Sequence, residues 1–338
     1  MEYPDSTSQP PYGRRNLLNA LLVLMVPLPA VLCAWLLFDR FPADSIPAAP
    51  AWTEVDSADQ LAAWLLHHPL VAANVFYFVF VNLVFWLIAI VQRSSWLIDP
   101  YWTLLPLLLA WFYLAHPMAT PDGTRALLAC AALVVWSARL TYNYFRREKW
   151  RFGLREDWRY AKMRRERSGF WWEQFLVVHI VQHLLLVGLT LPFWAISFCS
   201  QPPGPLDFVA FGLALAGVAI AGAADTQLDR FMRANEERLA RGEPKVWLLE
   251  TGLWRYSRHP NYFGEQLFWW SIAAFGIARG EPWVVVGTLL NSCVLAAVTV
   301  MTERRMADVP ERSALLADYR WRTSVWIPCP PRRSSFPE

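Results

Sequence analysis

Long apolar segments alternate with short polar segments along this chain. Eight segments have the length and the apolar character of helices that cross a bilayer, whose core of about 30 Å requires roughly 20 residues. They are residues 17–38, 70–92, 100–116, 125–145, 175–199, 206–224, 262–278 and 282–301. Residues 100–116 and 262–278 are the shortest. The pattern predicts an all-α polytopic membrane bundle of eight spanning helices, with seven to nine allowed.

Basic residues gather in alternate loops. With the amino terminus in the cytoplasm, 27 of the 31 Lys and Arg fall on the cytoplasmic side, ten of them between Arg146 and Arg167. The loop of residues 39–69 has a net charge of −4. Because cytoplasmic loops retain Lys and Arg, we expect an even number of spans and both termini in the cytoplasm. The basic loop 146–167 then faces membrane lipids, and nucleic acid is not an expected partner.

Composition narrows the class of protein further. Hydrophobic residues make up 55% of the chain and charged residues 17%, whereas soluble domains have roughly 25% charged residues. The five cysteines stand singly, without a CxxC pair, and no glycine-rich phosphate-binding motif is present. These observations exclude a disulfide scaffold and thiolate metal sites. His179 and His183 share one helix face, and we expect them to form hydrogen bonds to neighbouring helices, with no metal bound.

The densest polar cluster of the chain is residues 253–265, Leu-Trp-Arg-Tyr-Ser-Arg-His-Pro-Asn-Tyr-Phe-Gly-Glu, which lead into the segment 262–278. Polar side chains at membrane depth are costly, and they usually mark function. Pro260 fixes one φ angle and Gly264 permits close backbone approach, which favours a shaped loop. The alternative is an interfacial anchor, in which Trp and Tyr lie among the headgroups.

The segment from Arg258 to Glu265 resembles the steroid 5-alpha-reductase family, including its bacterial membrane-protein branch. The resemblance extends through residues 99–102, 136–143, 155–160, 224–228, 291–292, 302–304 and 319–328. It divides the chain into a divergent part, 1–95, with two spanning helices and an outer loop, a reductase-like membrane domain, 96–330, and a tail, 331–338. It also implies a bacterial inner-membrane protein whose active site faces the cytoplasm.

The resemblance implies that NADPH reduces a carbon–carbon double bond conjugated to a carbonyl in a lipid or steroid-like substrate. Tyr262 is then the expected proton donor, with Glu265 orienting it or acting as an acid, and His259 is the alternative donor. Arginines suit the phosphates of the cofactor, and Asn, Asp, Trp and Tyr suit its ribose and ring groups. The expected cofactor-binding residues are Arg139, Asn143, Asp225, Trp254, Arg258, Asn261, Glu303, Arg304, Tyr319 and Arg322, with Arg255 as a further cation.

Two other functions remain open from the sequence. Membrane methyltransferases of the isoprenylcysteine carboxyl methyltransferase type share a shorter His-Pro-x-Tyr-x-Gly core, and such an enzyme uses S-adenosylmethionine. They typically carry a Glu-Glu pair where this chain has Thr302 and Glu303, and the many arginines fit a phosphate-bearing cofactor better. The third reading is a non-catalytic lipid-binding protein. The sequence leaves the substrate, beyond being lipophilic, and the oligomeric state open.

Overall fold

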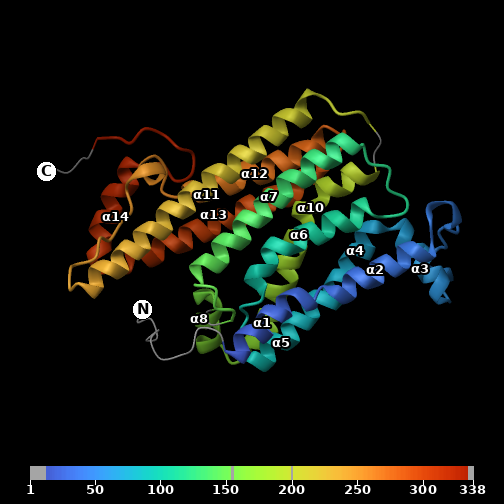
Figure 1. The fold of residues 1–338 in the computed structure, drawn as a ribbon, viewed down its shortest axis with the longest axis horizontal. Coiled ribbons are helices and arrows are strands. Elements are labelled where there is room, and N and C mark those ends of the chain that lie inside the picture. Colours follow the sequence, from blue (N-terminus) through green and yellow to red (C-terminus); the bar gives the residue numbers. More distant parts are fainter. Residues whose placement is uncertain (1–12, 154–155, 199–200, 334–338) are drawn as a thin grey trace. The chain divides into compact units, whose positions relative to one another are not determined.

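The computed structural model describes residues 13–153, 156–198 and 201–333. It is 76% helix, and the described residues contain no strand (Figure 1). The predicted all-α class is therefore confirmed. Cys199 at the end of one predicted span, Arg155 in one motif, and residues 334–338 of the predicted tail lie outside the described residues.

The chain forms two compact units. Unit 1 comprises residues 1–120 and 144–190, and unit 2 comprises residues 121–143 and 191–338. The predicted boundaries at residues 95 and 330 rest on sequence resemblance and stay predictions.

Unit 1 is built mostly from apolar helices, two of which continue through short π-helical turns. Its elements are α1 (Arg14–Met25), α2 (Leu28–Arg40), η1 (Ala43–Ser45), η2 (Trp52–Glu54), α3 (Ala58–His67), α4 (Pro69–Tyr77), η3 (Phe78–Leu83), α5 (Val84–Gln92), α6 (Ile98–Leu114), α8 (Trp158–Glu166), α9 (Phe170–Gln174), η4 (Phe175–Ile180) and the first half of α10 (Val181–Phe198). The polar groups that these helices bury are partly paired. The side chain of Asn82 lies 2.7 Å from Nδ1 of His183, which confirms the predicted hydrogen bond between neighbouring helices for His183. The prediction is wrong for His179, because both of its ring nitrogens are buried without a hydrogen-bond partner within the described chain. The described residues contain no group of three or more His, Cys, Asp or Glu that could hold a metal ion.

Unit 2 contains the long helices that carry the candidate site. Its elements are α7 (Gly123–Arg147) as far as Asn143, the second half of α10, α11 (Pro205–Ala240), η5 (Gly252–Arg255), α12 (Pro260–Ile277), η6 (Pro282–Val284), α13 (Val285–Ala307) and α14 (Pro310–Arg322). Proline occupies the first position of α11, α12 and α14, where its fixed φ suits a helix start and its missing N–H costs no bond. Helices α11, α12 and α13 run side by side, and α14 lies near the end of α11 (Figure 1).

Small residues let α11 and α12 touch backbone to backbone. A Cβ atom added at Gly217 would lie 2.7 Å from the carbonyl oxygen of Gly264 and from the amide nitrogen of Phe268, and one added at Gly264 would lie 2.6 Å from the carbonyl oxygen of Gly217. Close approach through small residues is the usual way in which helices associate within membranes. The α11–α12 crossing therefore depends on these two glycines.

A buried ion pair joins α7 to α11 near the first residues of both helices. Arg125 Nε lies 2.5 Å from Asp207 Oδ1, and both side chains are almost fully buried. The same guanidinium donates to the carbonyl oxygens of Gln201 at 2.8 Å and Pro202 at 3.0 Å. Because the charges are paired and their remaining hydrogen-bonding groups are largely used, the arginine is tolerated in the interior.

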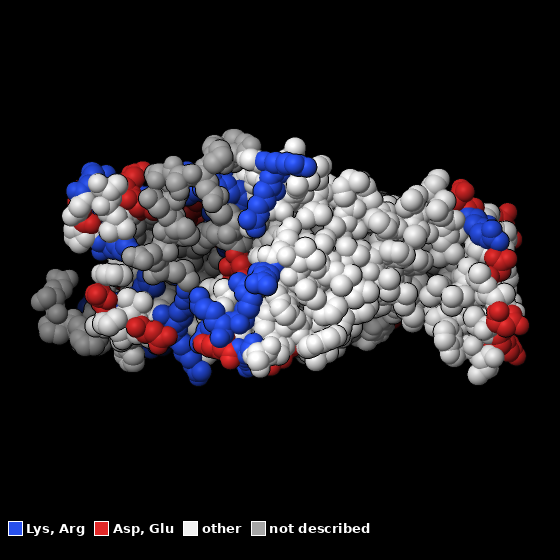
Figure 2. Space-filling model, turned by 90° about the horizontal axis from the view of Figure 1, so that it is seen from below, with Lys and Arg blue, Asp and Glu red and all other residues white. Residues whose placement is uncertain are grey.

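Within the described residues, six helical stretches are long and apolar enough to cross a bilayer: Arg14–Arg40, Pro69–Gln92, Gly123–Arg147, Phe170–Phe198, Pro205–Ala240 and Pro282–Ala307. The other two predicted spans fold as α6, of 17 residues, and α12, of 18 residues. On the face drawn in Figure 2, a broad stretch of surface carries no Lys, Arg, Asp or Glu, as lipid-facing surface requires. The chain is thus a polytopic helical membrane protein, while the count of eight and the position of the termini stay predictions.

The glycine contact between α11 and α12 is testable by adding one methyl group. We expect Gly217→Ala to lower the unfolding free energy by about 1–3 kcal/mol, because overpacking forces the helices apart. Gly212→Ala on the same helix is the control, since a Cβ there meets nothing within 4 Å and alanine favours the helix. The melting temperatures of both variants in detergent are the measurement. Equal melting temperatures would contradict the role assigned to Gly217.

Candidate functional site

The polar segment 253–265 begins as a loop whose shape is fixed by backbone pairing. Ser257 pairs with Ser324 in a parallel bridge. The amide of Arg258 donates to the carbonyl oxygen of Ser324 at 2.9 Å, and the amide of His259 donates to that of Val325 at 3.1 Å. The loop that leads into α12 is therefore held by the chain that follows α14.

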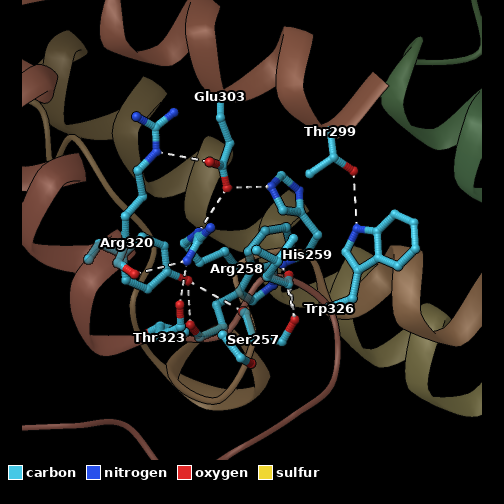
Figure 3. A network of polar contacts seen from close by, with 12 residues as sticks. Ser257, Arg258, His259, Thr299, Glu303, Arg320, Thr323 and Trp326 are labelled. Carbon is cyan, nitrogen blue, oxygen red and sulfur yellow. Dashed lines mark hydrogen bonds and ion pairs between the residues drawn. The ribbon is translucent and has the colours of Figure 1, made fainter. Parts of the chain in front are cut away.

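Glu303 of α13 is the centre of one network, the Glu303 network (Figure 3). Its carboxylate accepts from Arg258 Nε at 2.8 Å and Arg320 Nε at 2.9 Å, and it lies 3.1 Å from His259 Nε2. Arg258 Nη1 also donates to the carbonyl oxygens of Arg320, at 3.1 Å, and Thr323. Arg258, His259 and Glu303 are buried. The network joins the loop to α13 and α14, and it occupies much of the hydrogen-bonding capacity of Arg258.

Asp225 of α11 is the centre of a second network, the Asp225 network. Its carboxylate accepts from Arg139 Nη1 at 3.0 Å, from Asn143 Nδ2 at 2.9 Å and from Asn261 Nδ2 at 3.2 Å. Arg139 Nη2 also donates to Glu265, whose other oxygen accepts from Trp136 Nε1 at 2.8 Å. Arg139 and Asn143 thus reach the same carboxylate, as their spacing of four residues predicts.

A partly open hollow of about 240 Å³, the aromatic pocket, lies between these elements. Its lining comes from α11, the segment 247–262, α13 and α14: Leu228, Phe231, Met232, Trp247, Leu248, Leu249, Trp254, Arg258, His259, Asn261, Tyr262, Thr302, Glu303, Met306, Arg312, Leu316 and Tyr319. The rings of His259 and Tyr262 stack with centroids 5.1 Å apart and planes 13° from parallel. The pocket therefore has apolar walls and one polar side.

Two lining aromatic residues use their polar atoms to hold the pocket together. Tyr319 donates its hydroxyl to the carbonyl oxygen of Trp254, and Trp254 Nε1 donates to that of Ala224 at 3.2 Å. Burial raises the pKa of Tyr319, and the nearby Glu250 carboxylate raises it further. The hydroxyl therefore stays protonated at neutral pH, and both aromatic residues present ring surface to the pocket.

Two polar atoms in the pocket lining remain without a partner within the described chain. Oδ1 of Asn261 and Nε of Arg312 are both buried and make no hydrogen bond. Burial lowers the pKa of Arg312, and Arg305 lowers it further. Buried groups of this kind normally find a partner. The pocket thus offers one acceptor and one donor to a bound molecule.

An open hollow of about 680 Å³, the arginine depression, lies on the same unit. It is lined by Glu250, Thr251, Gly252, Arg255, Asp318, Arg322, Pro331, Arg332 and Arg333. Arg322 donates to Asp318 at 2.5 Å and to Glu250 at 2.7 Å. The depression adjoins the aromatic pocket along the chain, because α14 and the segment 249–255 contribute to both.

The predicted site residues fall into three groups. Seven of them line the aromatic pocket: Trp254, Arg258, His259, Asn261, Tyr262, Glu303 and Tyr319. Arg139, Asn143, Asp225 and Glu265 form the second network, which meets the pocket at Asn261. Arg255 and Arg322 line the depression, whereas Arg304 is exposed and lines neither hollow. The catalytic and cofactor-binding roles of these residues stay predictions.

Sequence reasoning missed most of the pocket wall. The sequence does not distinguish the apolar lining residues from other helix residues; they are Phe231, Met232, Met306 and Leu316. Arg312 likewise looks like any other surface cation. The run Trp247-Leu248-Leu249 carried a usable signal, because it is an apolar run within the polar stretch 241–251.

Comparison with known proteins gives the family of the chain. An uncharacterized protein of Schizosaccharomyces pombe is 29% identical over 260 residues, which cover 71% of this chain and 75% of that protein. No solved structure matches. The family model described as protein of unknown function DUF1295 matches residues 85–323, which contain both networks and the aromatic pocket. The chain therefore belongs to this family, which includes steroid 5-alpha-reductase-like proteins.

Proposed function

We propose that this protein is a membrane reductase that uses NADPH to reduce a carbon–carbon double bond conjugated to a carbonyl in a lipid or steroid-like substrate. The observation that carries the proposal is the aromatic pocket next to an arginine-rich depression on one unit. The likeness of the family to steroid 5-alpha-reductases supports it. The proposal includes a bacterial inner membrane and a site that faces the cytoplasm, where the cofactor is available.

The sizes of the two hollows support a cofactor that is only partly enclosed. Small-molecule pockets usually measure about 300–1,000 Å³, and the aromatic pocket, at about 240 Å³, has room for one ring system with its sugar. The rest of a dinucleotide must lie outside it, where the arginine depression offers cations. Arginine binds phosphate oxygens in pairs of parallel hydrogen bonds.

The residues of the pocket fit this cofactor. Trp247, Trp254 and Tyr319 provide aromatic surface for a ring. Asn261 Oδ1 and Arg312 Nε, the two buried atoms without a partner, would bond to amide, hydroxyl or phosphate groups. Arg258 is paired with Glu303, and Arg139 is paired with Asp225. We therefore propose that these two arginines support the site and do not contact phosphate directly.

The chemistry follows from the polar side of the pocket. NADPH supplies the hydride when bound. Negative charge develops on the carbonyl oxygen of the substrate as the double bond is reduced, and a hydrogen-bond donor must lie there. We assign this donor to the hydroxyl of Tyr262, whose ring is held parallel to that of His259. Glu303 fixes the His259 ring through its Nε2 atom.

Glu265 takes a different part in this proposal. Its two oxygens bond to Arg139 and to Trp136, so it positions α7 against α12. It therefore supports the site without acting as the acid.

The pocket also admits the adenosyl group of S-adenosylmethionine, because its volume suits a single nucleoside. This keeps a membrane methyltransferase as the second candidate. The depression argues for the reductase, since S-adenosylmethionine has no phosphate to place among four arginines. A non-catalytic lipid-binding protein is the third reading, and it requires neither cofactor.

Ligand binding separates the three functions. We expect NADPH to quench the fluorescence of the purified protein at micromolar concentrations, because Trp247 and Trp254 line the pocket, and we expect S-adenosylmethionine to have no effect. Titration in neutral-lipid nanodiscs is the measurement. A response to S-adenosylmethionine alone would replace the reductase by the methyltransferase, and no response to either would favour the lipid-binding protein.

The proton donor is testable with Tyr262→Phe. We expect turnover of a 4-en-3-one steroid or a polyprenyl enal to fall by about 10²–10⁴-fold, the usual contribution of a general acid, while the Kd for NADPH stays within about threefold. Tyr256→Phe in the same loop is the control, because Tyr256 is exposed. Unchanged turnover with weaker NADPH binding would instead assign Tyr262 to the cofactor.

The Glu303 network is testable by removing its centre. We expect Glu303→Ala to destabilise the protein by about 3–5 kcal/mol, because it leaves the buried cation of Arg258 without a counterion, and to weaken NADPH binding as the polar side of the pocket relaxes. Glu311→Ala on the exposed surface of α14 is the control. Thermal unfolding and the fluorescence titration measure the two effects, and a variant as stable as the control would contradict the role of Glu303.

A further inference from the structure

The segment that follows α14 folds back against the candidate site. After the pairing of Ser324 and Val325 with the loop, the amide of Cys329 donates to the carbonyl oxygen of Tyr256 at 2.9 Å. The amide of Arg332 then donates to the carbonyl oxygen of Arg322, also at 2.9 Å. These bonds bring the segment 329–333 to the rim of the arginine depression.

The charges in the depression are unbalanced. Four arginines line it against two acids, Glu250 and Asp318. Both acids are bonded to Arg322, whose side chain is three-quarters buried. The guanidinium groups of Arg255, Arg332 and Arg333 have no ion-pair partner within the described chain, and that of Arg332 lies 5.6 Å from the ring centroid of Trp321. Because both acids are bonded to the same arginine, three guanidinium groups lack a counterion in the described chain, and the lining as a whole has a net charge of +2.

The chemistry of this hollow suits one class of ligand. A phosphate monoester carries about −1.5 to −2 charges at neutral pH, and it offers three strong acceptor oxygens. That charge matches the surplus of the lining, whereas a carboxylate or a phosphate diester carries only one. Planar guanidinium groups are the side chains best suited to bind such oxygens in pairs.

We propose that the arginine depression is a phosphomonoester-binding site, in which Arg255, Arg332 and Arg333 hold the 2′-phosphate that distinguishes NADPH from NADH. This inference rests on the proposed reductase function. It makes the segment after α14, which lies beyond the part of the chain matched by the family model, a determinant of cofactor choice.

The test compares NADPH with NADH on matched variants in phosphatidylcholine nanodiscs. We expect the wild-type protein to bind NADPH at least about tenfold more tightly than NADH. The double variant Arg332→Ala/Arg333→Ala should lose about tenfold or more in affinity for NADPH and little for NADH, as expected when charged hydrogen bonds are removed. Arg230→Ala/Arg233→Ala on exposed α11 is the control, because it changes the net charge equally.

The outcomes separate the two proposals. If the wild-type protein binds NADPH and NADH equally, or if the double variant weakens the binding of both to the same extent, the assignment of the phosphomonoester site is wrong while the reductase proposal stands. If neither dinucleotide binds, both the phosphomonoester assignment and the reductase proposal fail. A lipid phosphomonoester is the other ligand with this chemistry. Nanodiscs that contain phosphatidic acid test it. If the wild type retains phosphatidic acid and the double variant does not, while the ratio of NADPH to NADH affinity is the same in both, the site binds the lipid and its assignment to the cofactor is overturned.

Discussion

The candidate site depends on two carboxylates that are each shared by several helices. Asp225 accepts hydrogen bonds from α7 and α12, and Glu303 accepts them from the loop before α12 and from α14 (Figure 3). A buried carboxylate is tolerated only where cations and donors surround it. The need to satisfy two such groups therefore fixes the positions of five helices at once, α7, α11, α12, α13 and α14, and the aromatic pocket lies among the last four.

This constraint separates the arginines by role. Arg139 and Arg258 are enclosed and bonded to carboxylates, so their charge is used within the protein. Arg255, Arg332 and Arg333 line open surface without such partners. A bound anion interacts most strongly with cations that have no counterion already, which is why the depression and not the interior is the better place for phosphate.

The sequence predicted the fold class and part of the site for understandable reasons. Apolar segments of membrane length have few alternatives to helix, because every backbone polar group must be satisfied internally. Arg139 and Asn143 are four residues apart, a spacing that places two side chains on one helix face, and both reach Asp225. The meeting of Arg258 with Glu303 was not predictable in this way, because 45 residues separate them. The pairing of Ser257 with Ser324 is equally non-local, and no periodic pattern in the sequence predicts it.

The contact between Gly217 and Gly264 is the point about which a change in the α11–α12 crossing angle would rotate the site. Asp225 lies eight residues along α11 from this point, which is about 12 Å at the rise of an α-helix. A change in crossing angle of about 5° would therefore displace Asp225 by about 1 Å, a distance at which positioned groups lose much of their effect. Backbone atoms in contact leave no side-chain rotamer to absorb such a change. The spacing of the polar groups is consequently set by the shape of the main chain where two glycines meet, at a contact that contains no side chain.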